Sequence, residues 1–241
     1  MTAPLLKVTG LKKAYGAIKA VDGVSFEVMP GEIFGVIGPN GSGKTTMFNS
    51  VLGQIDPDAG SIELNGRDIT GKSPLQLNQL GVGRTFQTLQ VFAKMTVRDN
   101  LAFPLRNRGR DEAYIAERVQ EIARMIGMED MLNRKARGLT ADAKQKISLG
   151  RGMVRKDVNA LLFDEPLTVI DPHMKWELRT QLKSLHNQFG HTMIYVTHDQ
   201  TEALTFADTV VVMHDGRVVQ SGTPAELFDK PAHTFVGYFI G

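Results

Sequence analysis

The feature that most constrains this chain is a glycine-rich loop, residues 38–45, that directly follows the continuous apolar run Ile33–Ile37. The loop reads Gly-Pro-Asn-Gly-Ser-Gly-Lys-Thr and matches the pattern G-x-x-x-x-G-K-S/T at every fixed position. An apolar run of this length is typical of a strand that is buried on both faces of a parallel sheet. The pattern therefore predicts a strand, a phosphate-binding loop and a helix over residues 46–52, in that order.

The loop also predicts where a nucleotide and its metal ion bind. Converging backbone N–H groups and the positive end of the following helix favour phosphate at this point of the fold. The expected nucleotide-binding residues are Gly38, Asn40, Gly41, Ser42, Gly43, Lys44, Thr45 and Thr46. The Lys44 ammonium would contact the β- and γ-phosphates, and the Thr45 hydroxyl would bind Mg²⁺. A chance match in a glycine-rich turn is the alternative, and the strand and helix on either side argue against it.

Two later apolar runs are similar to the first and end in polar residues. Residues 160–163 lead into Asp164 and Glu165, and residues 193–196 lead into Thr197 and His198. Buried parallel strands with polar residues at their carboxyl ends are typical of an α/β fold whose site lies along that edge. Asp164 is placed to bind Mg²⁺ through a water molecule, and Glu165 is placed to orient and deprotonate an attacking water.

The segment between the loop and the second apolar run has a helical period. Within residues 111–128 apolar side chains recur at helical spacing, at Ile115, Val119, Ile122 and Ile126. Asp111 can cap the start of this helix and Gly127 can end it. A further helix is expected after Thr140, so residues 88–138 are predicted to form a mainly helical insertion. Short β-like runs lie outside it, including two that flank the hairpin turn Asp215-Gly216.

Composition and charge exclude several classes of protein. The chain has 241 residues, no cysteine and a formal net charge of +2. It has no basic stripe of the kind that binds nucleic acid, and without cysteine it has no disulfide or thiolate metal site. The N-terminal residues lack the apolar region of a secretory signal, and no apolar stretch approaches the roughly 20 residues that cross a bilayer. If the protein serves a membrane process, we expect it to dock on another protein.

Taken together, these segments resemble the ATP-binding subunits of ABC transporters, and the resemblance covers essentially the whole chain. The resemblance implies that Tyr15 stacks on adenine and that Gln87 contacts both the metal ion and the attacking water. It also implies that His198 contacts the γ-phosphate and that Asp171 lies in the loop that couples the two sites of a dimer. The catalytic set would then be Glu165, His198, Gln87 and Lys44, with Thr45, Gln87 and Asp164 at the metal ion.

The same resemblance implies an architecture and a setting for the chain. The fold would be a single P-loop NTPase domain, residues 1–241, with a central mostly parallel sheet, an N-terminal antiparallel β-subdomain and an inserted α-helical subdomain. Residues 1–87 and 157–241 would form the catalytic core, and residues 88–156 the helical subdomain. The ligands would be ATP and Mg²⁺. The partners would be a second ATPase subunit and transmembrane permease subunits, without nucleic acid, on the cytoplasmic face of the cell membrane.

The family signature differs in this chain. ABC ATPases carry Leu-Ser-Gly-Gly-Gln facing the γ-phosphate of the partner's site, whereas this chain has Leu139, Thr140, Ala141 and Asp142. Thr140 can keep the hydroxyl and cap the next helix, but the Asp142 carboxylate would repel a phosphate about 4 Å away by a few kcal/mol. Alternatively, Asp142 is a first-turn acid that the helix dipole favours. We expect reduced ATPase activity at this half-site and a partner with a fuller signature.

Two parts of the chain resemble different subfamilies. Residues up to 87 resemble branched-chain amino acid importers, whereas the chain from about residue 95, including residues 163–166 and 236–241, resembles glycerol and sugar importers. Those importers usually continue into a regulatory β-domain, so a chimera or a shortened chain is one expectation. The favoured cargo is glycerol, another polyol or a sugar, with branched-chain amino acids second, although the nucleotide machinery does not report cargo.

Three other functions stay open from the residues alone. A DNA-repair or chromosome-organising ATPase would carry long insertions, coiled coils or zinc cysteines, none of which is present in the sequence. A protein that binds nucleotide but hydrolyses it poorly would explain Asp142, whereas Glu165 argues for catalysis. A small-molecule P-loop kinase gives no reason for Gln87, a signature helix and His198 in that order.

Overall fold

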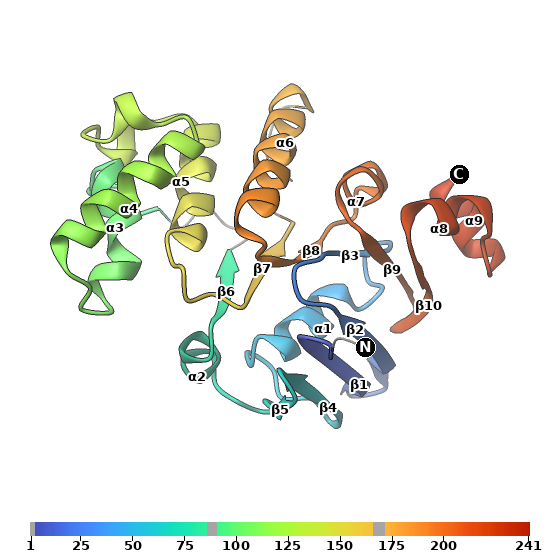
Figure 1. The fold of residues 1–241 in the computed structure, drawn as a ribbon. Coiled ribbons are helices and arrows are strands. Elements are labelled where there is room, and N and C mark those ends of the chain that lie inside the picture. The colour runs from blue at the N-terminus through green and yellow to red at the C-terminus, as the bar shows by residue number, and fades with distance from the viewer. Residues whose placement is uncertain (1–2, 86–90, 166–171) are drawn as a thin grey trace.

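The computed structural model describes residues 3–85, 91–165 and 172–241, which form two sheets with helices around them (Figure 1). The larger sheet comprises β3 (Ile33–Ile37), β6 (Val82–Thr85), β7 (Ala160–Asp164), β8 (Thr192–Val196), β9 (Thr209–His214) and β10 (Arg217–Gly222). Its strand order is β10-β9-β3-β8-β7-β6, and only β9 and β10 pair antiparallel. The predicted α/β fold with a mostly parallel central sheet is confirmed.

The smaller sheet is antiparallel and lies at the N-terminal end of the chain. It comprises β1 (Leu6–Tyr15), β2 (Ile18–Val28), β4 (Ala59–Leu64) and β5 (Arg67–Asp68), in the order β2-β1-β4-β5. The predicted runs were shorter than β1 and β2, because register shifts in the β1–β2 pair interrupt the alternation of buried and exposed residues. The predicted N-terminal antiparallel β-subdomain is confirmed.

Some of the helices lie around the sheets, and others form a separate group. They are α1 (Lys44–Val51), α2 (Pro74–Gln79), α3 (Val97–Arg106), α4 (Glu112–Met125), α5 (Ala141–Met153), α6 (Pro172–Phe189), α7 (Gln200–Phe206), α8 (Pro224–Asp229) and α9 (Thr234–Ile240). Two short 3₁₀ helices, Glu129–Met131 and Ala136–Gly138, link α4 to α5. We call α3, α4 and α5 the helical lobe, which stands apart from the sheets in Figure 1.

The helix α4 forms where its periodicity predicts. Its four predicted apolar residues and Ala123 are buried, and the Asp111 side chain accepts hydrogen bonds from the N–H groups of Ala113 and Tyr114 at 2.9 and 3.3 Å. Gly127, with a φ of 64°, follows the last turn and ends the helix. The apolar stripe packs against α3 and α5, so it holds the helical lobe together.

The central strand β3 divides the hydrophobic core into two layers. All five of its residues are buried. Ile33 and Ile37 belong to a layer shared with the helical lobe and helices α7–α9. Phe34 and Val36 face the other layer, under the smaller sheet and α1. Burial on both faces is what a continuous apolar run in a parallel sheet predicts, and it leaves the polar residues at the carboxyl end of the strand.

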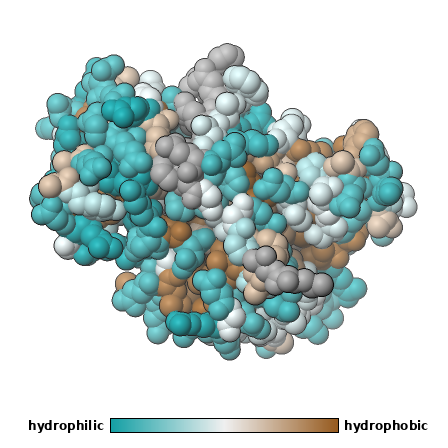
Figure 2. Space-filling model, in the orientation of Figure 1, coloured by the Kyte–Doolittle hydropathy of each residue, from teal (hydrophilic) through white to brown (hydrophobic). Residues whose placement is uncertain are grey.

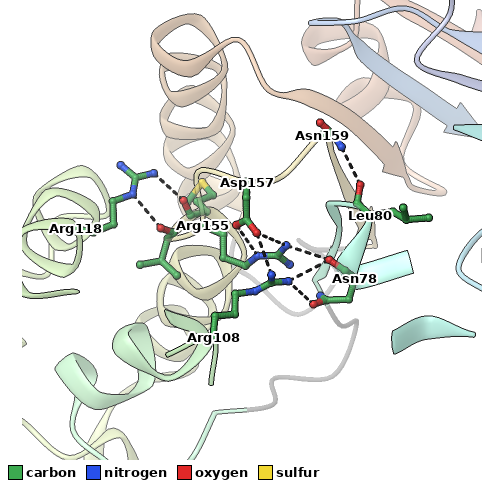
Figure 3. A network of polar contacts seen from close by, with 9 residues as sticks. Asn78, Leu80, Arg108, Arg118, Arg155, Asp157 and Asn159 are labelled. Atoms are coloured by element: carbon green, nitrogen blue, oxygen red, sulfur yellow. Dashed lines mark hydrogen bonds and ion pairs between the residues drawn. The ribbon is translucent and has the colours of Figure 1, made fainter. Parts of the chain in front are cut away.

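A network of two arginines joins the helical lobe to the core (Figure 3). Arg108 follows α3 and Arg155 follows α5, and both guanidinium groups donate to the backbone oxygen of Asn78, at 3.1 and 3.2 Å. Both also pair with the carboxylate of Asp157, at 3.0 and 3.1 Å. The C-terminal end of α2 is thereby tied to the ends of two lobe helices.

Arg118 and Asn159 make further hydrogen bonds in the same region of the structure. Arg118, on α4, is 1% exposed and donates to the backbone oxygens of Met153 and Val154, both at 2.9 Å. These carbonyls lie at the end of α5, where helices leave carbonyl groups without intrahelical donors. Asn159 donates to the backbone oxygen of Leu80 at 2.8 Å and so connects the starts of β7 and β6 (Figure 3).

The surface is mostly hydrophilic on the face shown in Figure 2, and hydrophobic residues gather over the sheets rather than over the helical lobe. Among the described residues, no helix combines the length and the apolar character needed to span a membrane.

Candidate functional site

The glycine-rich loop connects β3 to α1 and needs glycine at two crowded positions. A Cβ at Gly43 would collide with the backbone oxygen of Ala20, and Gly43 has a φ of 95°. A Cβ at Gly38 would collide with the backbone oxygen of Met213. Gly41 has a φ of 81° but is exposed with open space around it. The loop is therefore packed on one side and open on the other, where a phosphate can approach its backbone.

Lys44 lies under this loop rather than in solvent. Its side chain is 5% exposed, and Nζ donates to the backbone oxygens of Gly38 and Pro39, each at 2.9 Å. Burial lowers the pKa of Lys44, and the negative charges of Glu165 and Asp164 oppose that effect. The ammonium group is therefore close enough to both acids to feel their charge, although they follow a different strand.

The two acids lie at the carboxyl end of β7. Asp164 is 2% exposed and pairs with Val196 of β8. The N–H of Glu165 donates to the backbone oxygen of Val196 at 2.8 Å, and Glu165 has a φ of 44°. A positive φ is uncommon for a residue other than glycine and costs about 1 kcal/mol or more. This conformation turns the Glu165 side chain away from the direction that a continuing strand would give it.

His198 follows β8 and meets Glu165. Its Nδ1 atom lies 3.3 Å from Oε1 of Glu165. The N–H of Thr197 donates to the backbone oxygen of Val36 at 3.1 Å, so the end of β8 is tied to the strand that precedes the loop. Four of the predicted residues, Lys44, Asp164, Glu165 and His198, therefore lie along one edge of the larger sheet.

The other predicted nucleotide-binding residues differ in exposure. Ser42 is buried, Thr46 is half-buried, and Asn40 and Thr45 are exposed at the loop and the start of α1. Tyr15, at the end of β1, is 49% exposed, with Nζ of Lys13 6.0 Å from its ring centre. An exposed ring at a strand end is available to stack on a base.

Gln87 and Asp171 lie outside the described residues. Their expected roles, at the metal ion and between two sites of a dimer, stay predictions from the sequence.

The signature segment begins α5. Thr140 is the N-cap residue, and its hydroxyl accepts a hydrogen bond from the N–H of Ala143 at 3.3 Å. Asp142 lies in the first turn, with Oδ2 3.7 Å from Nζ of Lys146. The other carboxylate oxygen of Asp142 is buried and finds no hydrogen-bond donor among the described residues. Leu139 packs partly buried against the core, and Ala141 is exposed. The predicted capping role of Thr140 is confirmed.

Sequence reasoning missed a polar cluster beside His198. Glu202 is 2% exposed and contacts Tyr195, Thr197 and Lys175. The spacing Asp199-x-x-Glu202 is typical of a capping box, in which the glutamate stays at the helix surface and bonds to the N-cap backbone. That pattern signals the start of α7, where Asp199 is the N-cap residue, but it does not predict that the Glu202 side chain contacts Tyr195, Thr197 and Lys175.

The donors along this edge fit a hydrated Mg²⁺ ion. Among the described residues no group of three or more His, Cys, Asp or Glu side chains could hold a metal by itself. Mg²⁺ in phosphoryl-transfer sites is bound by one or two carboxylates, a hydroxyl and the phosphates of the substrate, with water in the remaining positions. A buried carboxylate at Asp164 and an exposed hydroxyl at Thr45 match that requirement.

Comparisons with known proteins agree on one family. The family model described as "ABC transporter" matches residues 21–168. The sn-glycerol-3-phosphate import ATP-binding protein UgpC 3 of Rhizobium etli is 39% identical over 98% of this chain and 67% of that protein. UgpC of Brucella abortus is 38% identical over 96% of this chain and 65% of its own length. The trehalose/maltose import ATP-binding protein MalK of Thermococcus litoralis is 38% identical over 98% of this chain and 64% of its own length.

Solved structures agree with these sequence relatives. The ADP conformation of MJ1267, an ATP-binding cassette of an ABC transporter, has a TM-score of 0.84 and 27% identity, covering 98% of this chain and 99% of that one. The structure of cbiO1 from Clostridium perfringens, part of the ABC transporter complex cbiONQ, has a TM-score of 0.87 and 27% identity, covering 95% and 92%.

The relatives also bear on the expected origin of the chain. The chain spans about two thirds of the length of the curated relatives that it matches. Glycerol phosphate and sugar import proteins match it from end to end, over 96–98% of its residues. The expectations of a chimera and of a branched-chain amino acid importer in the N-terminal part are therefore not supported. The chain belongs to the ABC transporter family and is one of its import ATPase subunits.

Proposed function

We propose that ATP binds along the edge formed by the glycine-rich loop and the carboxyl ends of β7 and β8. The loop amides and Lys44 would hold the phosphates, and the ring of Tyr15 would stack on adenine. Thr45, Asp164 and Gln87 would bind Mg²⁺, which when bound neutralises charge on the β- and γ-phosphates. The observation that carries the proposal is the convergence of Lys44, Asp164, Glu165 and His198 from separate segments on one edge.

Glu165 is proposed as the general base. It would accept a proton from the attacking water as the water oxygen bonds to the γ-phosphorus, and the bond from that phosphorus to the bridging oxygen would break. The products are ADP and inorganic phosphate. Lys44 and the loop amides would stabilise the negative charge of the transition state. His198, beside Glu165, would contact the γ-phosphate and keep the carboxylate in place.

The proposed working unit is a dimer on a permease. The signature residues Leu139 to Asp142 would face the γ-phosphate of the partner's site, and Asp171 would couple the two sites. The helical lobe would transmit closure of the dimer to transmembrane permease subunits on the cytoplasmic side of the membrane. The names of the relatives, which are import ATP-binding proteins, support this assignment.

The proposed cargo class is a glycerol phosphate or another polyol, with an oligosaccharide second. Support comes from the names of the relatives, which are import proteins for sn-glycerol 3-phosphate and for trehalose and maltose. The test is uptake of labelled glycerol 3-phosphate, maltose and leucine by cells with and without this chain. A deficit for glycerol 3-phosphate alone is expected, and a deficit for leucine alone would overturn the cargo assignment.

The nucleotide site is tested by separating binding from hydrolysis. Calorimetry with MgATP should register binding for both the wild type and Glu165→Gln, because the substitution keeps the shape of the side chain. Release of inorganic phosphate should fall at least 100-fold in Glu165→Gln, since a general base contributes roughly 10²–10⁴-fold. A wild type that binds no MgATP, or a variant that hydrolyses ATP at the wild-type rate, would contradict the proposal.

A further inference from the structure

A buried carboxylate lies directly behind the turn that carries His198. Glu202, in the first turn of α7, is 2% exposed. Its Oε2 atom accepts hydrogen bonds from the hydroxyl groups of Tyr195, at 3.0 Å, and Thr197, at 2.9 Å. Its Oε1 atom lies 3.0 Å from Nζ of Lys175. A carboxylate in this position is costly to desolvate unless donors surround it, and here hydroxyl and ammonium donors reach both oxygens.

The hydroxyl of Tyr195, one of the donors to Glu202, is held in the protonated state. Burial, and then the charge of Glu202 and the hydrogen bond to it, raise the pKa of Tyr195 well above its usual value. The hydroxyl of Tyr195 therefore remains a donor throughout the working pH range. Lys175 also lies 3.6 Å from Oδ2 of Asp199, so one ammonium group contacts two carboxylates of the same turn.

The contacts continue through the turn to His198. The hydroxyl of Thr197 donates to Glu202 and at the same time accepts from the N–H of Asp199, at 3.0 Å. The side chain of Asp199 in turn accepts from the N–H of Glu202, at 3.2 Å. Thr197 is thus bound directly to the Glu202 carboxylate, and Asp199 is linked to it through the Thr197 hydroxyl and through Lys175. The N–H of Thr197 donates to Val36, which fixes the turn from the opposite side.

We propose that Glu202 is a positioning residue for ATP hydrolysis, which holds residues 197–199 so that His198 stays against Glu165. The inference rests on the proposed function of Glu165 and His198. Glu202 would act by fixing the backbone on both sides of His198. Lys175 lies in α6, so its contact with the Glu202 carboxylate connects this turn to that helix. A displacement of α6 would therefore change the position of His198.

Glu202→Ala is expected to reduce kcat about 10- to 100-fold, because a misplacement of about 1 Å in a catalytic group can cost about 100-fold. The KM for ATP and the Kd from calorimetry should stay within about threefold, since the Glu202 carboxylate binds Tyr195, Thr197 and Lys175, which are not among the proposed nucleotide-binding residues. Loss of the buried carboxylate leaves the hydroxyl groups of Tyr195 and Thr197 without their acceptor, and this can destabilise the fold. Two gentler variants therefore accompany it: Thr197→Val removes the hydroxyl at similar volume, and Thr197→Ser keeps it. We expect Thr197→Val to lose kcat and Thr197→Ser to retain it.

A double-mutant cycle with His198→Ala separates positioning from general stability. If Glu202 acts through His198, Thr197→Val or Glu202→Ala will lower kcat little further in the His198→Ala background. Leu64→Ala in β4, a buried residue in the other layer of the core, serves as the control that lowers thermal stability without lowering kcat. Additive losses in the cycle, or kcat losses that follow the melting temperature across all variants, would overturn the inference.

An NMR measurement that does not depend on ATP hydrolysis distinguishes a failure of the Glu202 inference from a failure of the proposed function. The imidazole NMR signals of His198, identified by their loss in His198→Ala, should shift in Thr197→Val, whereas those of His214 and His233 should not. An unmoved His198 signal would refute positioning even if the wild type hydrolysed ATP. If the His198 signal shifts in Thr197→Val but the wild type lacks ATPase activity, the result would instead count against the proposed function.

Discussion

The Nδ1 atom of His198 lies 3.3 Å from Oε1 of Glu165, and the two residues follow different strands of the larger sheet. Parallel register accounts for their meeting, because Asp164 pairs with Val196 and the next residues of both strands leave the sheet at the same edge. The positive φ of Glu165 then directs its side chain toward the turn after β8. The contact therefore depends on strand register together with one unusual backbone conformation.

The buried position of Lys44 leads to a prediction for nucleotide affinity. Lys44→Met should weaken ATP binding at least tenfold, because charge-assisted hydrogen bonds to phosphate contribute about 1.5–3 kcal/mol. Lys183→Met, at an exposed position of α6, changes the net charge equally and should leave affinity unchanged. Calorimetric titration with MgATP measures both variants, and equal affinities for the two would show that Lys44 does not bind the phosphates.

The glycine loop predicts a difference between two substitutions with similar backbone cost. Gly41→Ala and Gly43→Ala both place a methyl group on a residue with positive φ, which costs roughly 1 kcal/mol. Only Gly43→Ala also drives Cβ into the backbone oxygen of Ala20. We expect Gly43→Ala to lower the free energy of unfolding by about 2–3 kcal/mol and Gly41→Ala by about 1 kcal/mol or less. Urea denaturation tests this order, and the reverse order would show that the loop is packed differently.

The charge of Asp142 leads to a prediction for turnover. If the first turn of α5 faces a partner's phosphate, Asp142→Gly and Asp142→Asn should hydrolyse ATP faster than the wild type, because a repulsion of a few kcal/mol is removed. Asp142→Asn keeps the side-chain volume and so separates charge from backbone flexibility. Wild-type turnover at or above that of both variants would show that Asp142 acts as a first-turn acid and does not weaken the site.

Asp157 predicts how stability changes in acid. Burial raises its pKa, but the hydrogen bond from Arg155 and the charges of Arg155 and Arg108 outweigh burial and hold the pKa below its ordinary value. Because the folded state binds this proton less readily than the unfolded state, the stabilisation is present above the unfolded pKa and is lost as pH falls through the folded pKa. The free energy of unfolding of the wild type should therefore decrease as the pH falls below about 4.

Asp157→Asn tests this expectation directly. At neutral pH the variant should be about 1–2 kcal/mol less stable, since Arg155, 5% exposed, loses its ionic partner. Its stability should then fall less steeply in acid than that of the wild type. Asp130→Asn, at an exposed position of the 3₁₀ helix Glu129–Met131, should follow the wild-type curve. Parallel acid curves for the wild type and Asp157→Asn would indicate that the arginine network contributes nothing to linkage.

Local patterns in the sequence determined the strand, loop and helix around Lys44, the helix α4 with its Asp111 cap, and the hairpin at Asp215-Gly216. Each of these depends on contacts between residues close in the chain: glycine conformations, capping hydrogen bonds and an apolar period that matches the geometry of one element. The acids at the end of β7 and the histidine at the end of β8 were also predictable, because a buried strand that ends in polar residues has a direct sequence signal.

Only the tertiary structure decided what those residues meet. The pattern Asp199-x-x-Glu202 predicts a surface capping box, yet Glu202 is buried because Tyr195, Thr197 and Lys175 supply donors from a strand, a turn and another helix. The convergence of Arg108 and Arg155 on Asn78 has the same origin, since the three residues lie on segments far apart in the chain. The direction of a side chain between two possible faces depends on where donors and acceptors from distant segments lie, and a local pattern carries no information about them.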